Sequence, residues 1–209
     1  MNDHLAHWLR LTAAALGEAG ARFAVVGGLA VSARAEVRFT RDVDMAVAAA
    51  ADHEAERLLA RLLRTGFRPI AELDHKPTGR LATMRLAPPG VSFVDFDAEQ
   101  PPVVDLLFAT TGIEPEVVNE ATPFDFRHTL LPVAPVPHLI AMKNQSAGPR
   151  RRKDELDLEA LFAVATADDF ARARQLTRLI VERGYHQQRD LLRELDERWH
   201  RLGPEQGNV

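Results

Sequence analysis

The chain has 209 residues, of which 46% are apolar and 27% charged, an ordinary composition for a globular protein with one core and a helical annex or with two small lobes. Its net charge of −4 excludes a global nucleic-acid-binding signature, so any contact with RNA or DNA would depend on a local basic patch. The absence of cysteine excludes disulfides, thiolate catalysis and zinc–thiolate sites, and it fits a cytoplasmic protein.

The first part of the chain alternates helical and strand patterns. Residues 3–19 predict an amphipathic helix that is too short and too polar for a signal peptide or a membrane span. Apolar periodicity then predicts a strand at 23–26, a short helix at 29–36, a strand at 42–47 and a helix at 53–64. Gly27-Gly28 separates the first strand from the short helix.

The middle of the chain is rich in strand patterns and turn residues. We expect strands at 80–86, 91–96, 103–108 and 130–133, with at most a short helix between 110 and 129. From Pro137 onward the pattern becomes helical, with helices expected at 138–145, 153–165, from a cap at Asp168 or Asp169 to about 184, and at 187–202.

These elements predict an α/β (α+β) fold, with a small mixed β-sheet lobe at 1–135, a C-terminal helical bundle at 136–202 and a disordered tail at 203–209.

Asp42 and Asp44 are the first candidate site. Residues two apart in a strand point to the same face, so both carboxylates would project together. Two adjacent carboxylates repel each other unless a cation lies between them, and Mg²⁺ or Mn²⁺ prefers such oxygen ligands. Gly27 and Gly28 open onto a helix N-terminus, where backbone N–H groups can bind a phosphate.

Asp105 is the candidate third ligand. It lies within the apolar segment VVDLLF, where a charge is costly unless it is paired or bound to a metal. Asp95 and Asp97 alternate on another predicted strand and are the rival third ligand, although their surroundings are more polar.

The pattern of Gly27-Gly28, thirteen intervening residues, Asp42-x-Asp44 and a later Asp105 resembles the nucleotidyltransferase superfamily with the DNA polymerase β-like fold. A second segment, LIAMK ending at Lys143 followed by RKDELDL, is similar to the C-terminal signature of AbiEii/MenT-type minimal nucleotidyltransferase toxins. The resemblance covers about residues 23–161. It implies that 1–135 is a catalytic lobe and that an NTP donates its NMP to an acceptor hydroxyl.

The resemblance also implies residue roles. Asp42, Asp44 and Asp105 would bind Mg²⁺ or Mn²⁺, and Lys143 would contact the nucleotide phosphates. Asp157, or its neighbour Asp154, would support the site. The residues expected to bind the nucleotide are Gly27, Gly28, Arg41, Lys143 and Asp157.

Further basic residues flank these motifs. Arg34, Arg38 and Arg41 precede the acidic pair, and the basic run 150–153 follows Lys143, so both groups are candidates for phosphate contacts.

The partners implied are an NTP, an acceptor such as tRNA, a protein or a small molecule, and an antitoxin, with no membrane. The alternative is a catalytically inactive protein that keeps the fold and only binds a partner or nucleotide.

Overall fold

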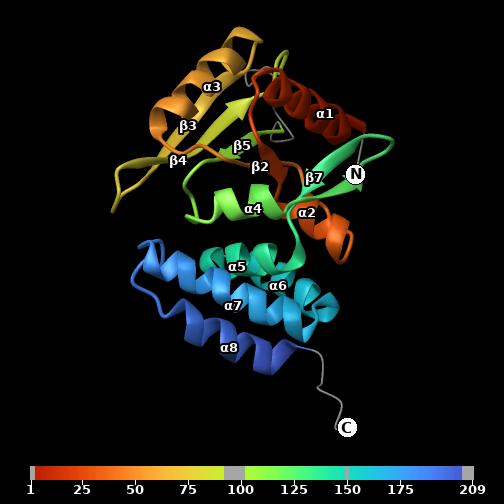
Figure 1. Ribbon diagram of the computed structural model, residues 1–209. Helices are drawn as coiled ribbons and strands as arrows, with labels where there is room; N and C mark the ends of the chain where they lie inside the picture. Colours follow the sequence, from red (N-terminus) through yellow and green to blue (C-terminus); the bar gives the residue numbers. More distant parts are fainter. Residues whose placement is uncertain (1–2, 92–101, 149–150, 204–209) are drawn as a thin grey trace.

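The computed structural model describes residues 3–91, 102–148 and 151–203, and Figure 1 shows their arrangement. Within these residues a seven-stranded mixed sheet has the order β3-β4-β5-β2-β1-β7-β6. Its strands are β1 Phe23–Val25, β2 Val43–Val47, β3 Arg68–His75, β4 Arg80–Ala87, β5 Val104–Leu107, β6 Thr122–Asp125 and β7 Leu130–Val133. The β2–β5 and β1–β7 pairs are parallel and the other pairs are antiparallel.

Helices cover both faces of the sheet. They are α1 Asp3–Glu18, α2 Gly27–Arg34, α3 Asp52–Arg64, α4 Glu114–Glu120, α5 Val136–Ser146, α6 Arg152–Val164, α7 Ala167–Glu182 and α8 Leu191–Leu202. Figure 1 shows α1 and α3 above the sheet, α2 and α4 below it, and α5 to α8 stacked beneath them. The central strands β1 and β2 are therefore buried on both faces, which explains why their sequences read as nearly continuous apolar runs.

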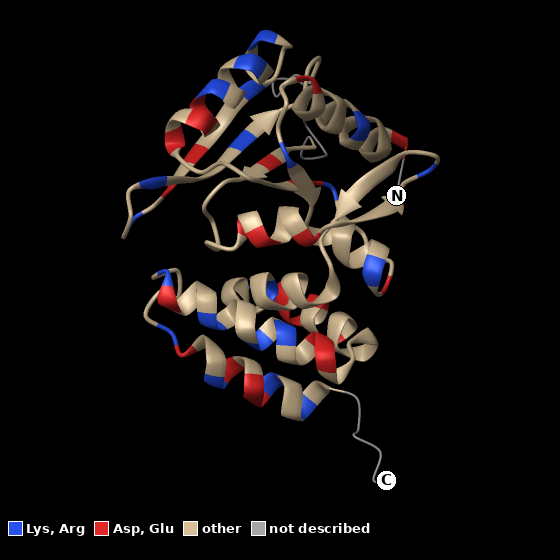
Figure 2. Cartoon of the chain, in the orientation of Figure 1, with Lys and Arg blue, Asp and Glu red and all other residues tan. Residues whose placement is uncertain are grey.

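The helical layer packs through one face of each helix. Leu158, Leu161 and Phe162 of α6 and Ala173, Leu176 and Ile180 of α7 are buried, with at most 1% of each surface exposed. Figure 2 shows charged residues of both signs along α3, α7 and α8, and none of them is buried. The helices therefore bury apolar faces against each other and the sheet while their charged faces meet solvent.

The predicted mixed α/β fold is confirmed, although several predicted elements differ. The strands β3 and β6 were not predicted, because β3 is mostly exposed and polar and β6 lies in the ambiguous segment 110–129. Thr166 caps α7 through a capping box with Asp169, so the predicted cap at Asp168 or Asp169 is wrong. Helix α8 begins at Leu191, after two residues with positive φ, and not at Gln187.

Some predictions fall outside the described residues. Val91 is not part of a strand, and the rest of the strand expected at 91–96 lies outside the described ranges, together with Asp95 and Asp97. Arg150 and the tail from residue 204 onward lie outside them as well.

Candidate functional site

A cavity of about 850 Å³ brings together residues from the sheet, from the loop before β2 and from helices α2, α5 and α6. This volume is in the range of small-ligand sites. The predicted site residues that line it are Gly28, Arg41, Asp42, Asp44, Asp105 and Lys143, and they are joined by Arg151, Arg152, Lys153 and Asp154. Segments more than 100 residues apart in the sequence therefore meet in one hollow.

Strand pairing brings the acids together. In the parallel β2–β5 pair, Asp44 lies directly opposite Asp105, and Asp42 stands just before β2 begins. Side chains opposite each other on neighbouring strands share a face and lie close together. The predicted juxtaposition of the acidic pair with Asp105 thus follows from the register of two central strands.

Arg85 is a site residue that the sequence interpretation missed. It lies opposite Asp105 in the antiparallel β4–β5 pair, and its guanidinium donates two hydrogen bonds to that carboxylate, Nε to Oδ1 at 2.8 Å and Nη2 to Oδ2 at 2.7 Å. The sequence signal was a basic residue inside the otherwise apolar segment TMRLA. That signal becomes specific only once the register of β4 against β5 is known.

The Gly27-Gly28 turn packs directly against Asp44. The backbone N–H of Gly28 hydrogen bonds to the Asp44 side chain, and the N–H of Val26 donates to the Asp44 carbonyl at 3.0 Å. Gly27 has a φ of +61°, and a Cβ there would lie 2.0 Å from Asp44 Oδ2. The two glycines therefore hold the carboxylate of Asp44, a candidate metal ligand on β2, against the first turn of α2. They also leave this end of the helix open toward the cavity.

Gly27→Ala should destabilise the protein by at least about 2 kcal/mol, because the methyl group would overlap Asp44 and the residue would retain a left-handed conformation. The matched control is Gly17→Ala in helix α1, where an added Cβ meets nothing within 4 Å, and this change should be neutral or stabilising. Urea denaturation of both variants measures the difference. Equal stabilities would contradict the close packing of Gly27 against Asp44.

The clustered acids resist ionisation. Burial and the neighbouring charge of Asp105 raise the pKa of Asp44 from 3.8 to about 7, and the same two causes raise the pKa of Asp42. The half-buried carboxylates at the cavity therefore carry an electrostatic cost in the absence of an added cation. Such a cost is typical of functional sites.

Lys143 and Asp157 belong to a buried ion-pair network. The Lys143 ammonium contacts Asp154 Oδ1 and Asp157 Oδ2, each at 2.7 Å, and Arg38 Nε lies 2.5 Å from Asp157 Oδ1. Burial lowers the pKa of Lys143, but the charges of Asp154 and Asp157 outweigh it, so the pKa lies above its ordinary value. Both candidate acids thus contact Lys143, whereas fully buried Asp157 does not line the cavity.

The three arginines before the acidic pair have different environments. Arg41 is exposed at the cavity with its guanidinium 5.3 Å from the centre of the Phe39 ring, and Arg38 binds Asp157. Arg34 instead donates to the backbone carbonyls of Thr122, Val133 and Ala134. Its side chain therefore ties α2 to strands β6 and β7 and is not directed to a phosphate.

The fit of the acids to a divalent cation is partial. Asp42, Asp44 and Asp105 line one cavity and offer the hard oxygen donors that Mg²⁺ or Mn²⁺ requires. Within the described ranges, however, no group of three or more acidic or histidine side chains is arranged to hold a metal ion. Both oxygens of Asp105 accept hydrogen bonds from Arg85 in this arrangement.

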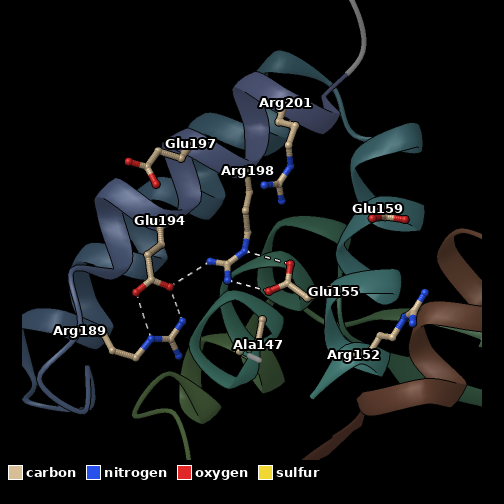
Figure 3. A pocket seen from close by; sticks show the side chains of 10 residues that line it. Ala147, Arg152, Glu155, Glu159, Arg189, Glu194, Glu197, Arg198 and Arg201 are labelled. Atoms are coloured by element: carbon tan, nitrogen blue, oxygen red, sulfur yellow. Dashed lines mark hydrogen bonds and ion pairs between the residues drawn. The ribbon is translucent and has the colours of Figure 1, made fainter. Parts of the chain in front are cut away.

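A second cavity, of about 760 Å³, lies between α6 and α8 and is shown in Figure 3. There Arg198 of α8 reaches between Glu155, at 2.8 Å, and Glu194, at 3.1 Å, and Arg189 also pairs with Glu194. Each of these four side chains is thus paired with at least one opposite charge. The cluster therefore fastens α8 to α6 and does not present an obvious ligand site.

Two solved structures share this fold. A nucleotidyltransferase-like antigenic protein from Paracoccidioides brasiliensis is 18% identical, with a TM-score of 0.52 and 93% of each chain covered. ANT(2'')-Ia, solved in complex with adenylyl-2''-tobramycin, is 17% identical, with a TM-score of 0.52, 86% of this chain covered and 97% of the other. The fold is thus that of nucleotidyltransferases.

The family follows from the sequence as a whole. The model of the family described as "Nucleotidyl transferase AbiEii toxin, Type IV TA system" matches residues 10–205, and the chain belongs to this family. The protein is therefore a nucleotidyltransferase. No curated protein matches the chain. In the part of the chain that the structure describes, no helix is long and apolar enough to cross a membrane.

Proposed function

We propose that the protein transfers an NMP from an NTP to an acceptor hydroxyl in a reaction that depends on Mg²⁺ or Mn²⁺ held by Asp42, Asp44 and Asp105. The observation that supports this most strongly is the convergence of three carboxylates from separate segments on one cavity that also carries basic side chains. Phosphoryl-type transfer depends mainly on positioning and on neutralising charge, and these are the properties that such a cavity supplies.

The positions of the three acids suggest different roles for them. Asp42 and Asp44 lie at the beginning of β2, where they would hold the cation beside the triphosphate. Asp105 lies on the neighbouring strand, where it would orient the acceptor hydroxyl and accept its proton. The divalent cation, when bound, neutralises charge on the phosphates and lowers the pKa of the attacking hydroxyl.

The basic side of the cavity suits the triphosphate. Lys143 and the segment Arg151, Arg152 and Lys153 approach it from α5 and from the start of α6. Lys143 is held in place by Asp154 and Asp157, so its ammonium is oriented before a nucleotide binds. Asp157 acts through Lys143 and Arg38, because its carboxylate is fully buried. Gly28 at the start of α2 also lines the cavity, where its backbone N–H donates to the Asp44 side chain, and the absence of a side chain at Gly27 leaves space for that carboxylate.

The biological role we propose is that of a toxin in a toxin–antitoxin system, which rests on membership of the AbiEii family. The acceptor classes under test are RNA such as tRNA, protein and small molecules, since each offers a hydroxyl. The partner under test is an antitoxin.

The deciding experiment incubates the protein with each labelled NTP, Mg²⁺ or Mn²⁺, and either bulk tRNA, a protein lysate or aminoglycosides. We expect label transfer to one acceptor class, and a fall of at least about a hundredfold in Asp44→Ala, because ligands of a catalytic ion contribute several kcal/mol to transition-state binding. Asp74→Ala, in the exposed strand β3, is the matched control and should retain full transfer.

Label transfer that persists in Asp44→Ala would rule out the metal assignment. Metal-dependent NTP binding without transfer to any acceptor would favour the inactive binding protein.

A further inference from the structure

Arg85, Asp105 and Asp44 form one row across three neighbouring strands. Arg85 of β4 is the register partner of Asp105 in β5, and Asp105 is the register partner of Asp44 in β2. Cross-strand partners project from the same face of a sheet. A basic side chain therefore stands at one end of the row that contains two of the proposed metal ligands.

Arg85 occupies the carboxylate of Asp105, which is the third proposed metal ligand. Its fork contacts both oxygens of Asp105, which is 8% exposed. Each oxygen keeps another lone pair, but a divalent cation bound there would lie close to the guanidinium charge with little solvent to screen it. Asp42 and Asp44, in contrast, take part in no ion pair within 4.0 Å in the described ranges.

The side chain of Arg85 also faces the cavity, where a second partner could bind it. Its side chain is 45% exposed and lines the cavity that contains Gly28, Lys143 and the basic start of α6. A planar guanidinium binds phosphate oxygens in the same two-pronged geometry in which it binds a carboxylate. A phosphate group in the cavity is therefore a chemically equivalent partner for the fork.

We propose that Arg85 is a positioning residue that withholds Asp105 from metal until the triphosphate of a bound NTP draws the guanidinium away. In the resting protein, Asp42 and Asp44 are free to take one cation while Asp105 stays with Arg85. Triphosphate binding then transfers the fork of Arg85 to phosphate oxygens and makes Asp105 available. The assignment rests on the proposed metal-dependent transfer and adds an order to it, in which the nucleotide binds before Asp105 becomes a metal ligand.

The test measures Mn²⁺ binding by calorimetry, with no nucleotide present, to the wild-type protein, Arg85→Lys and Arg85→Met. We expect Mn²⁺ to bind at least about fivefold more tightly, or with one additional ion per chain, in both variants. Arg85→Lys is decisive because it keeps the positive charge and loses the fork. The gain in affinity should disappear in the double variant Arg85→Lys/Asp105→Asn. The matched control is Arg80→Met: Arg80 is the first residue of β4, and its loss breaks an ion pair with Asp52 of α3. This variant should bind Mn²⁺ as the wild type does.

The outcomes separate this assignment from the proposed function. If the wild type binds Mn²⁺, Asp44→Ala does not, and Arg85→Lys binds no more tightly than the wild type, the role of Arg85 is overturned and the metal site stands. Absence of Mn²⁺ binding in every variant overturns the metal site itself. A second readout is the Mg²⁺ dependence of label transfer: in Arg85→Lys the half-saturating Mg²⁺ concentration should fall while the maximal rate also falls, and a protein in which Arg85 only stabilises the strands would show neither change.

Discussion

Asp44→Asn should make the protein more stable by about 2 kcal/mol at pH 8 while it abolishes nucleotidyl transfer. The pKa of Asp44 rises from 3.8 to about 7 because the carboxyl is removed from solvent and faces Asp105. At about 1.4 kcal/mol per pKa unit this corresponds to at most about 4 kcal/mol, and solvent contact of the half-buried side chain reduces it to about 2 kcal/mol. Asparagine keeps the size and can still accept the hydrogen bond from Gly28.

The sign of the pH dependence follows from where the proton resides. Below pH 3.8 Asp44 is protonated in the folded and unfolded chains, so its charge costs nothing. Between pH 3.8 and about 7 only the unfolded chain ionises at this residue, so the folded state loses stability as the pH rises. Above about pH 7 the full cost is present. The stability gap between Asp44→Asn and wild type should therefore open from pH 4 to pH 7 and stay constant above it.

Urea denaturation at intervals of half a pH unit measures the difference in free energy of unfolding between Asp44→Asn and the wild type. The matched control is Asp74→Asn on the exposed strand β3, which should not differ from the wild type at any pH. Saturating Mg²⁺ should stabilise the wild type and leave Asp44→Asn unchanged, because a ligand stabilises only a protein that binds it. If the wild type were as stable as Asp44→Asn at pH 8 without metal, ionisation of Asp44 would carry no cost in the folded protein, and this explanation would be wrong.

Asp157→Asn should lower the free energy of unfolding by about 3 kcal/mol. The carboxylate is fully buried and pairs with two cations, Arg38 from the loop before β2 and Lys143 from α5. Removing one member of a buried ion-pair network leaves the other charges without compensation, and this is costlier than the pair was worth. The change should also loosen the loop that carries Phe39, Thr40 and Arg41 along the cavity, so transfer should fall with stability.

A double-mutant cycle isolates the network. Lys143→Met alone and Asp157→Asn alone should each be destabilising, while the double variant should lose at least about 1 kcal/mol less than the sum. Asp154→Asn, one turn earlier on α6 and facing the same ammonium, is the matched control and should cost less because 11% of the Asp154 side chain still meets solvent, against 0% for Asp157. Additive losses in the cycle would mean that Asp157 stabilises the fold independently of Lys143.

Much of the candidate site was readable from the order of residues. Gly27-Gly28 before a helix and two alternating acids before an apolar strand are local patterns, and a charge at Asp105 inside an apolar strand is conspicuous for energetic reasons. Helix α5 with Lys143 and helix α6 with its acids were also predicted, since helical periodicity depends on neighbours within two turns. The exposed strand β3 was missed because it lacks a buried face that would imprint alternation on its sequence.

What the sequence alone determined was the set of acids, the lysine and the mixed α/β class, because these depend on residue type and local spacing. Which charged side chains pair with each other depends on the tertiary structure. The register of β4 against β5 places Arg85 on Asp105, and the packing of α6 against α5 and beside α2 places Asp157 between Lys143 and Arg38, which lies in the loop that follows α2. The Arg85–Asp105 and Arg38–Asp157 pairs join residues 20 and 119 positions apart, and a local pattern carries no record of the strand order and helix packing that create them.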